Sequence, residues 1–355
     1  MFEDNNFDIN VENEQVQNEE NSEPVSPYAI IPEEYHEKRK IRRMAAAVGI
    51  PALSLSAIGY FWGYAYLLIT TKILGMTKDS AVALLQNQGM QQLLQILLSC
   101  LMFLVPFSIA AKCIGVNIDD TIKFNKAKKG TFLPFVLFGV GFCAFTNIAM
   151  SFSSAFFDTF IKQEYNAPHA STPSGIYGFI LSFIATAIVP ALVEEFACRG
   201  IILGLLRKFG DGFAIITSAI IFGMMHGNFD QIPFATVVGL ILGYIYVKTE
   251  SIWPCILVHG INNAVSVLLT YSVGIISVDV QNAIYLMYLI IAMLLAIFAV
   301  LLFSKKCDGN YSLERKDSVL SEKQKYIAFF TSWIIIIFLL SNLYEAVSYF
   351  AFWEK

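Results

Sequence analysis

A series of apolar runs, each about 20 residues long, constrains this chain more than any other feature. A helix of that length crosses a ~30 Å hydrocarbon core. The chain is also 56% hydrophobic and only 15% charged, whereas soluble domains are about a quarter charged. We therefore expect an all-α polytopic membrane bundle of about eight to nine transmembrane helices. The candidate spans are residues 44–71, 91–111, 132–157, 176–206, 211–227, 232–247, 252–273, 283–303 and 326–347.

Lys and Arg residues are unevenly distributed between the two sides that alternating spans would define. Nineteen of the 24 either precede the first span or fall in the loops on its side of the membrane, which are 112–131, 207–210, 248–251 and 304–325. Only four lie on the opposite side. Cytosolic loops carry an excess of Lys and Arg, so we expect a cytosolic N-terminus. The compact architecture and Asn/Lys/Ile-rich style favour a bacterial plasma membrane.

The N-terminal segment has a composition unlike the rest of the chain. Residues 1–37 contain eleven acidic residues and no Lys or Arg. Such a segment cannot bury enough apolar surface to fold, so we predict a disordered acidic cytosolic tail over residues 1–40. The six cysteines form no CxxC pair and no His/Cys cluster, which argues against a disulfide framework and a thiolate metal site.

Polar side chains recur at similar depths in three of the predicted spans. Counted from the nearest basic loop at the helical rise, Glu194 lies at ~20 Å, His226 at ~22 Å, His259 at ~12 Å and Asn263 at ~18 Å. Ionisable groups in lipid cost several kcal/mol, so those that are retained usually face a bundle interior or a water-filled cavity. We expect these side chains to share one polar site inside the membrane.

The stretch "LVEEFACRG", residues 192–200, places two carboxylates and one cation in an apolar run. Glu195 and Arg199 are four residues apart and therefore share a helix face. This pair alone could be a buried ion pair that only fixes helix packing. Glu194 has no cation on its own face, which makes it the stronger functional candidate.

Three GxxxG pairs lie in consecutive predicted spans. Small residues at this spacing let membrane helices approach backbone to backbone, so we expect one compact bundle around the polar site. The histidines and Asn263 could equally be interhelical hydrogen-bonding groups without a catalytic role. The three pairs are Gly200–Gly204, Gly223–Gly227 and Gly239–Gly243.

The polar residues occur in motifs that resemble those of a known family. "EEFACRG" resembles the EExxxR motif of the CAAX protease and bacteriocin-processing (CPBP, or Abi) family of intramembrane proteases. Phe222 and His226 in "FGMMHGN" resemble its FxxxH motif, and His259 and Asn263 in "HGINN" resemble its HxxxN motif. The three motifs occur in the family's order within residues 176–270. Cys198 departs from the pattern, since an aromatic residue is common there.

The resemblance implies an intramembrane endopeptidase whose partners are a protein or peptide substrate and the lipid bilayer, with no nucleic acid. Glu194 resembles the base that activates water, and His226 its partner. His259 and Asn263 resemble groups that hold the water, a metal or the oxyanion, while Glu195 and Arg199 resemble a supporting pair. We expect N-terminal helices over 44–157, the catalytic core over 176–273 and C-terminal helices over 283–347.

Two chemistries remain open from the sequence. Glu194, His226 and His259 form a plausible ligand set for Zn2+ or another divalent metal. In the metal-free alternative, Glu194 and His226 activate water while His259 and Asn263 bind the oxyanion. Two other functions also remain open: a non-catalytic immunity or binding protein against a bacteriocin, and a proton-coupled transporter.

Overall fold

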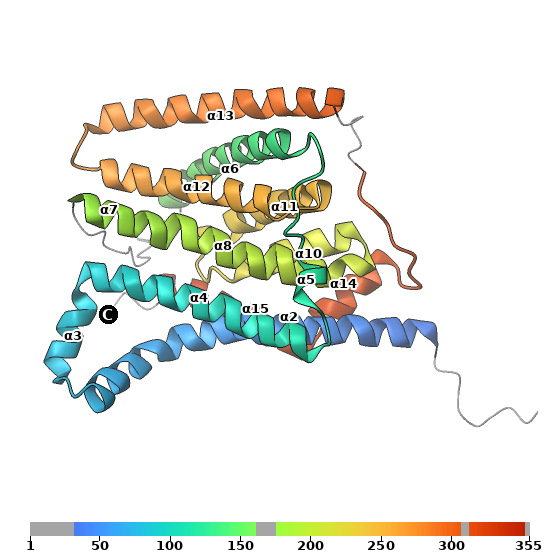
Figure 1. Cartoon of the computed structure of the whole chain (residues 1–355), viewed down its shortest axis with the longest axis horizontal. Coiled ribbons are helices and arrows are strands. Elements are labelled where there is room, and N and C mark those ends of the chain that lie inside the picture. The colour runs from blue at the N-terminus through green and yellow to red at the C-terminus, as the bar shows by residue number, and fades with distance from the viewer. Residues whose placement is uncertain (1–31, 161–174, 307–311, 352–355) are drawn as a thin grey trace, which may run out of the picture.

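The chain folds into an α-helical bundle whose long helices run roughly side by side (Figure 1). The computed structural model describes residues 32–160, 175–306 and 312–351, and these contain no β-strand. The helices are α2 Glu33–Leu68, α3 Lys78–Gln86, α4 Gln88–Cys113, α5 Ile118–Thr121, α6 Phe132–Phe160, α7 Gly175–Phe183, α8 Val189–Glu195, α9 Gly204–Leu206, α10 Asp211–Met224, α11 Gln231–Thr249, α12 Trp253–Ser272, α13 Val278–Lys306, α14 Glu322–Phe330 and α15 Trp333–Ala351.

The predicted membrane architecture is confirmed, with seven to eight candidate spans where about eight to nine were expected. Within the described residues, seven helical segments are long and apolar enough to cross a membrane. An eighth is obtained if α14 and α15, which meet at a bend of 71°, form one broken span. The chain is therefore an integral membrane protein. The seven are Glu33–Ile73, Gln88–Cys113, Phe132–Ser151, Gly175–Phe209, Gln231–Thr249, Trp253–Ser272 and Val278–Lys305.

The span predicted over 211–227 is the one that falls short. Helix α10 has only 14 residues, or ~21 Å at the helical rise, which is less than a ~30 Å core. The chain reverses soon after Met224, where Gly227 adopts a left-handed φ of 61°, and α11 runs back along α10. This left-handed turn explains why an apolar run of span length does not become a full span.

The first helix begins earlier than predicted. Residues 1–31 of the expected acidic tail lie outside the described residues, but the part from Glu33 to Lys40 is helical. Two acidic residues in the first turn, Glu33 and Glu34, stabilise the positive end of the helix dipole. The Glu37 carboxylate accepts hydrogen bonds from the backbone N–H of Val319 at 3.0 Å and of Leu320 at 3.3 Å. This anchors the start of α2 to the segment before α14.

The four loops predicted to lie on one side of the membrane do meet at one end of the bundle, near the start of α2 (Figure 1). Backbone hydrogen bonds join Lys128 to Thr249 at 3.0 Å and Asp211 to Glu314 at 3.1 Å. The Lys325 Nζ donates to the Phe209 carbonyl at 2.8 Å. We refer to this end, where most of the cations gather, as the basic end.

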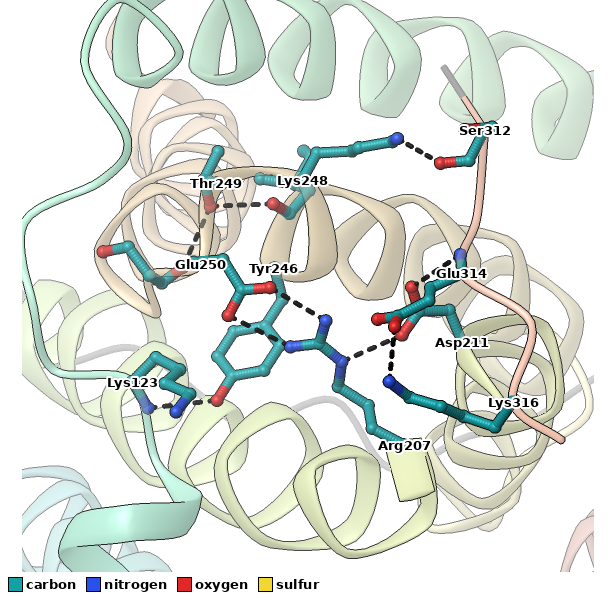
Figure 2. Close-up of polar contacts among 12 residues, drawn as sticks. Lys123, Arg207, Asp211, Tyr246, Lys248, Thr249, Glu250, Ser312, Glu314 and Lys316 are labelled. Atoms are coloured by element: carbon teal, nitrogen blue, oxygen red, sulfur yellow. Dashed lines mark hydrogen bonds and ion pairs between the residues drawn. The ribbon is translucent and has the colours of Figure 1, made fainter. Parts of the chain in front are cut away.

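Arg207 organises the basic end at the point where the fourth spanning segment stops (Figure 2). Its Nε donates to Asp211 at 2.9 Å, and its two terminal nitrogens donate to Glu250 at 2.8 and 3.2 Å. Such a bidentate arginine–carboxylate pair fixes orientation as well as distance. These three residues, the Arg207 cluster, therefore join the end of that segment to α10 and α11.

Close glycine packing is confirmed for α10 against α11. A Cβ added at Gly223 would lie 1.9 Å from Thr236 Oγ1, and one at Gly239 would lie 3.0 Å from the Cα of Ala219. Because neither position has room for a side chain, the two backbones pack at the short distance that GxxxG motifs allow.

The other predicted glycine contacts differ. Gly200 and Gly204 face Ile122 and Thr121 at the end of α5, which is a short helix at the basic end and not a membrane-spanning partner. Gly227 lies beyond α10 in the turn. The expectation of span-to-span packing at these three glycines was therefore wrong.

Candidate functional site

The motif "EEFACRG" lies on one continuous helical segment, Gly175–Phe209, which we call the site helix. It contains two π-helical stretches, Ile184–Ile188 and Phe196–Leu203, on either side of α8. Both glutamates fall in the last turn of α8, and Arg199 falls in the second π-helical stretch. Single π-helical turns inside α-helices frequently occur at functional sites because they change the direction of the side chains that follow.

Glu195 lies at the centre of the site. Its Oε1 accepts a hydrogen bond from Arg199 Nη1 at 2.8 Å, the pair that the spacing predicted, and lies 2.8 Å from His259 Nδ1. The Glu195 side chain is completely buried. Because a carboxylate only accepts, the His259 Nδ1–H is the donor, and a neutral ring then presents the lone pair of Nε2 on its other side. Glu195 therefore fixes the orientation and the tautomer of His259.

Arg199 is buried with Glu195 and has further contacts with α10 and α11. Its Nη2 donates to the Gly239 carbonyl at 3.3 Å, and its guanidinium carbon lies 4.5 Å from the centre of the Phe222 ring. The Arg199 Nε and the Glu195 Oε2 find no hydrogen-bond partner among the residues described. A buried ion pair with incomplete hydrogen bonding contributes little net stability, which favours a functional reason for its presence.

Glu194 lies on the more open side of the same cluster. Its Oε2 is 3.8 Å from His259 Nε2, and its side chain is 18% exposed, compared with 0% for Glu195. A gap of 3.8 Å is too long for a direct hydrogen bond but suits two groups that share a water molecule. The two adjacent glutamates thus face different nitrogens of one imidazole ring: Glu195 bonds Nδ1 directly, and Glu194 lies 3.8 Å from Nε2.

Asn263 contacts the site helix at Thr186, eight residues before Glu194. Its Nδ2 donates to the Thr186 carbonyl at 3.2 Å, and Gln95 of α4 donates to the neighbouring Ala185 carbonyl at 3.3 Å. Both carbonyls belong to the first π-helical stretch. These amides satisfy backbone groups at that stretch and hold α4, α12 and the site helix together.

Sequence reasoning missed two supporting amides, Gln95 and Asn147. The Asn147 Nδ2 donates to Asn262 at 3.3 Å, and Asn262 in turn lies 3.4 Å from Asn263. In the sequence, Gln95 and Asn147 are marked only as polar side chains within apolar helices. That pattern does not show which residue of another helix each amide will bond.

His226 lies in the turn after α10. Its Nδ1 is 2.9 Å from the Phe222 carbonyl, and the Phe222 ring contacts both imidazoles edge to face, with centroid distances of 5.0 Å to His226 and 5.9 Å to His259. The described residues contain no group of three or more His, Cys, Asp or Glu side chains placed to hold a metal ion. That Glu194, His226 and His259 hold a metal therefore stays a prediction.

Comparison with known proteins supports the motif resemblance for the central part of the chain. Residues 176–265 match the family model for type II CAAX prenyl endopeptidase Rce1-like proteins. Over 90 residues the chain is 32% identical to the Bacillus subtilis (strain 168) protein named "Putative membrane peptidase YdiL". That alignment covers 25% of this chain and 37% of the relative. No solved structure gives a significant match.

Proposed function

We propose that this chain, which carries an Rce1-like segment at its centre, is an intramembrane endopeptidase that cleaves a membrane-associated protein or peptide. One observation carries the proposal. His259 is held through Nδ1 by a buried carboxylate at 2.8 Å, while its Nε2 faces a second, more open carboxylate at 3.8 Å. An oriented imidazole beside a free carboxylate is an arrangement that can bind and activate a water molecule.

In this mechanism the water lies between Glu194 and His259 Nε2. Glu194 takes a proton from the water as its oxygen bonds to the carbonyl carbon of the substrate. When the C–N bond breaks, the same proton passes from Glu194 to the leaving amine. Hydrolysis thus needs one group that first accepts and then donates a proton, and a low-dielectric site suits a carboxyl group to both roles.

The other motif residues support this step. One N–H of the Asn263 amide donates to Thr186, which leaves its second N–H for the oxyanion. His226 acts as the partner of Glu194 in activating the water, as the family resemblance implies. Glu195 and Arg199 keep His259 oriented and do not contact the substrate.

We propose the metal-free form of this mechanism, and metal analysis tests it. We expect active purified protein to contain less than about one-tenth equivalent of any transition metal and to keep its activity in a chelator, because no step here uses a metal. Activity that is lost in the chelator and restored by Zn2+ would instead support the alternative ligand set of Glu194, His226 and His259.

Substrate trapping tests the function itself. A Glu194→Gln variant should retain a bound substrate that mass spectrometry can identify, and the wild-type protein should cleave that substrate. Saturable peptide binding without turnover by the wild type would indicate an immunity or binding protein, and proton-coupled flux in liposomes would indicate a transporter. We further propose a bacterial plasma membrane with the basic end in the cytosol, because cytosolic loops are enriched in Lys and Arg.

A further inference from the structure

A second polar feature lies on the far side of His226, outside the three family motifs. A cavity of about 280 Å³ is lined by side chains from α2, α4, α15 and the turn after α10. Its polar lining includes Ser56, Tyr60, His226, Asn342 and Glu345. His226 lines this cavity, and the Phe222 ring that it contacts also contacts His259 of the proposed catalytic site.

Glu345 is the notable group in this cavity. It lies on α15, twelve residues after the start of that apolar helix and six before its last described residue. The described residues provide no hydrogen bond or ion pair to its carboxylate, and the side chain is half-buried. An ionisable group retained inside a membrane protein usually faces a partner that it binds.

The Glu345 carboxylate is also held close to His226. A Cβ placed on Gly227, the residue after His226, would lie 2.9 Å from Glu345 Oε2 and 3.0 Å from its carboxyl carbon. Gly227 has a φ of 61°, so the turn favours glycine there. The last helix therefore presents its acid directly beside the turn that carries a motif histidine.

The walls of the cavity indicate what it can hold. Leu55, Met102, Phe103 and Met225 provide apolar surface, and Tyr60 provides an aromatic ring. A Lys or Arg side chain combines an aliphatic stem, which packs on such walls, with a charged head that pairs with a carboxylate. Aromatic rings add further attraction for a cation.

We propose that this cavity is a specificity pocket for a basic substrate residue next to the cleaved bond, and that Glu345 is the residue that selects it. This inference rests on the proposed peptidase function. Glu345 lies outside residues 176–265, the part that matches the family model, so the preference would belong to this chain's own C-terminal helix.

The test uses the full chain in lipid nanodiscs with two sets of fluorescent peptides. In the first set a single Lys occupies successive positions of a neutral apolar peptide. In the second set norleucine, which has a similar aliphatic stem without the charge, replaces that Lys. Both cleavage and binding by fluorescence anisotropy are measured. The variants are Glu345→Gln, Glu345→Lys and, as a control, Asp279→Asn, an exposed acid at the start of α13.

Wild type should favour the best Lys peptide over its norleucine counterpart by about tenfold or more, as expected for a hydrogen bond to a charged group. Glu345→Gln should lose this preference while norleucine peptides behave as with wild type, and Glu345→Lys should prefer a Glu peptide. Asp279→Asn should match wild type.

Equal losses for both peptide sets in Glu345→Gln, or an unchanged preference, would overturn the proposal. If no peptide is cleaved, the peptidase function fails, but the binding measurement still decides the role of Glu345.

Discussion

Two clusters, each centred on an arginine, lie eight residues apart on the site helix. They differ in how deeply the arginine is buried and in how completely its hydrogen bonds are formed. Arg199 pairs with Glu195 four residues before it, and Arg207 pairs with Asp211 four residues after it. The Arg199 side chain is 1% exposed, whereas that of Arg207 is 20% exposed. The first pair is sealed inside the bundle and the second lies at its basic end.

The more exposed cluster also has the more complete hydrogen bonding. Arg207 uses three nitrogens on two acids, whereas the Arg199 Nε and the Glu195 Oε2 have no partner within the described part of the chain. An ion-pair cluster that stabilises a fold gives each of its polar groups a hydrogen-bond partner, and the three bonds of Arg207 fit this description. We infer that the central pair is kept because Glu195 orients His259, and that the Arg207 cluster serves to join helices.

The sharpest test of this comparison is Glu194→Gln, which removes the basicity and keeps the shape of the motif glutamate that neither arginine contacts. Cleavage should fall by about 10²–10⁴-fold, the usual contribution of a general base. The melting temperature should stay near that of wild type, because no ion pair to Lys or Arg is lost. Turnover and thermal unfolding in the same detergent provide the measurement. A variant that still cleaves, or one that loses activity only by unfolding, would show that the two glutamates are wrongly assigned.

Glu195→Gln should have the largest effect on stability. It leaves Arg199 buried beside a neutral amide, and breaking a buried ion pair costs about 3–5 kcal/mol. Activity should fall as well, because His259 loses the carboxylate that fixes its tautomer. Equilibrium unfolding in mixed micelles measures the change in the free energy of unfolding. If stability matched wild type, Arg199 would not depend on Glu195 as a buried ion-pair partner.

Glu250→Gln is the matched change at the basic end and should have the smallest effect. Glu250 is 28% exposed, and Arg207 would keep its bond to Asp211. The expected loss is therefore about 1 kcal/mol or less, as for other solvent-accessible pairs, with cleavage unchanged. The same unfolding assay and turnover measurement apply. A loss as large as that of Glu195→Gln would remove the distinction between the two clusters.

Much of the architecture could be predicted from the sequence, because its causes are local. The length of each apolar run indicated a membrane helix, and the Lys and Arg bias correctly grouped the loops that meet at the basic end. The spacing of four residues correctly paired Glu195 with Arg199. The short α10 was missed because its length depends on the left-handed turn at Gly227, and an apolar run does not show where a chain reverses.

What the sequence determined by itself is the inventory of the membrane site: an all-α membrane chain with two adjacent glutamates, an arginine, two histidines and an asparagine at similar depth. Only the tertiary structure decided how these groups are connected. The contact between His259 and Glu195 spans 64 residues, and Glu345 reaches the turn beside His226 from the last helix. The periodicity of a sequence reports which residues share a face of one helix. Which faces then meet depends on how several helices pack, and that decides which glutamate holds the histidine and which remains open to water.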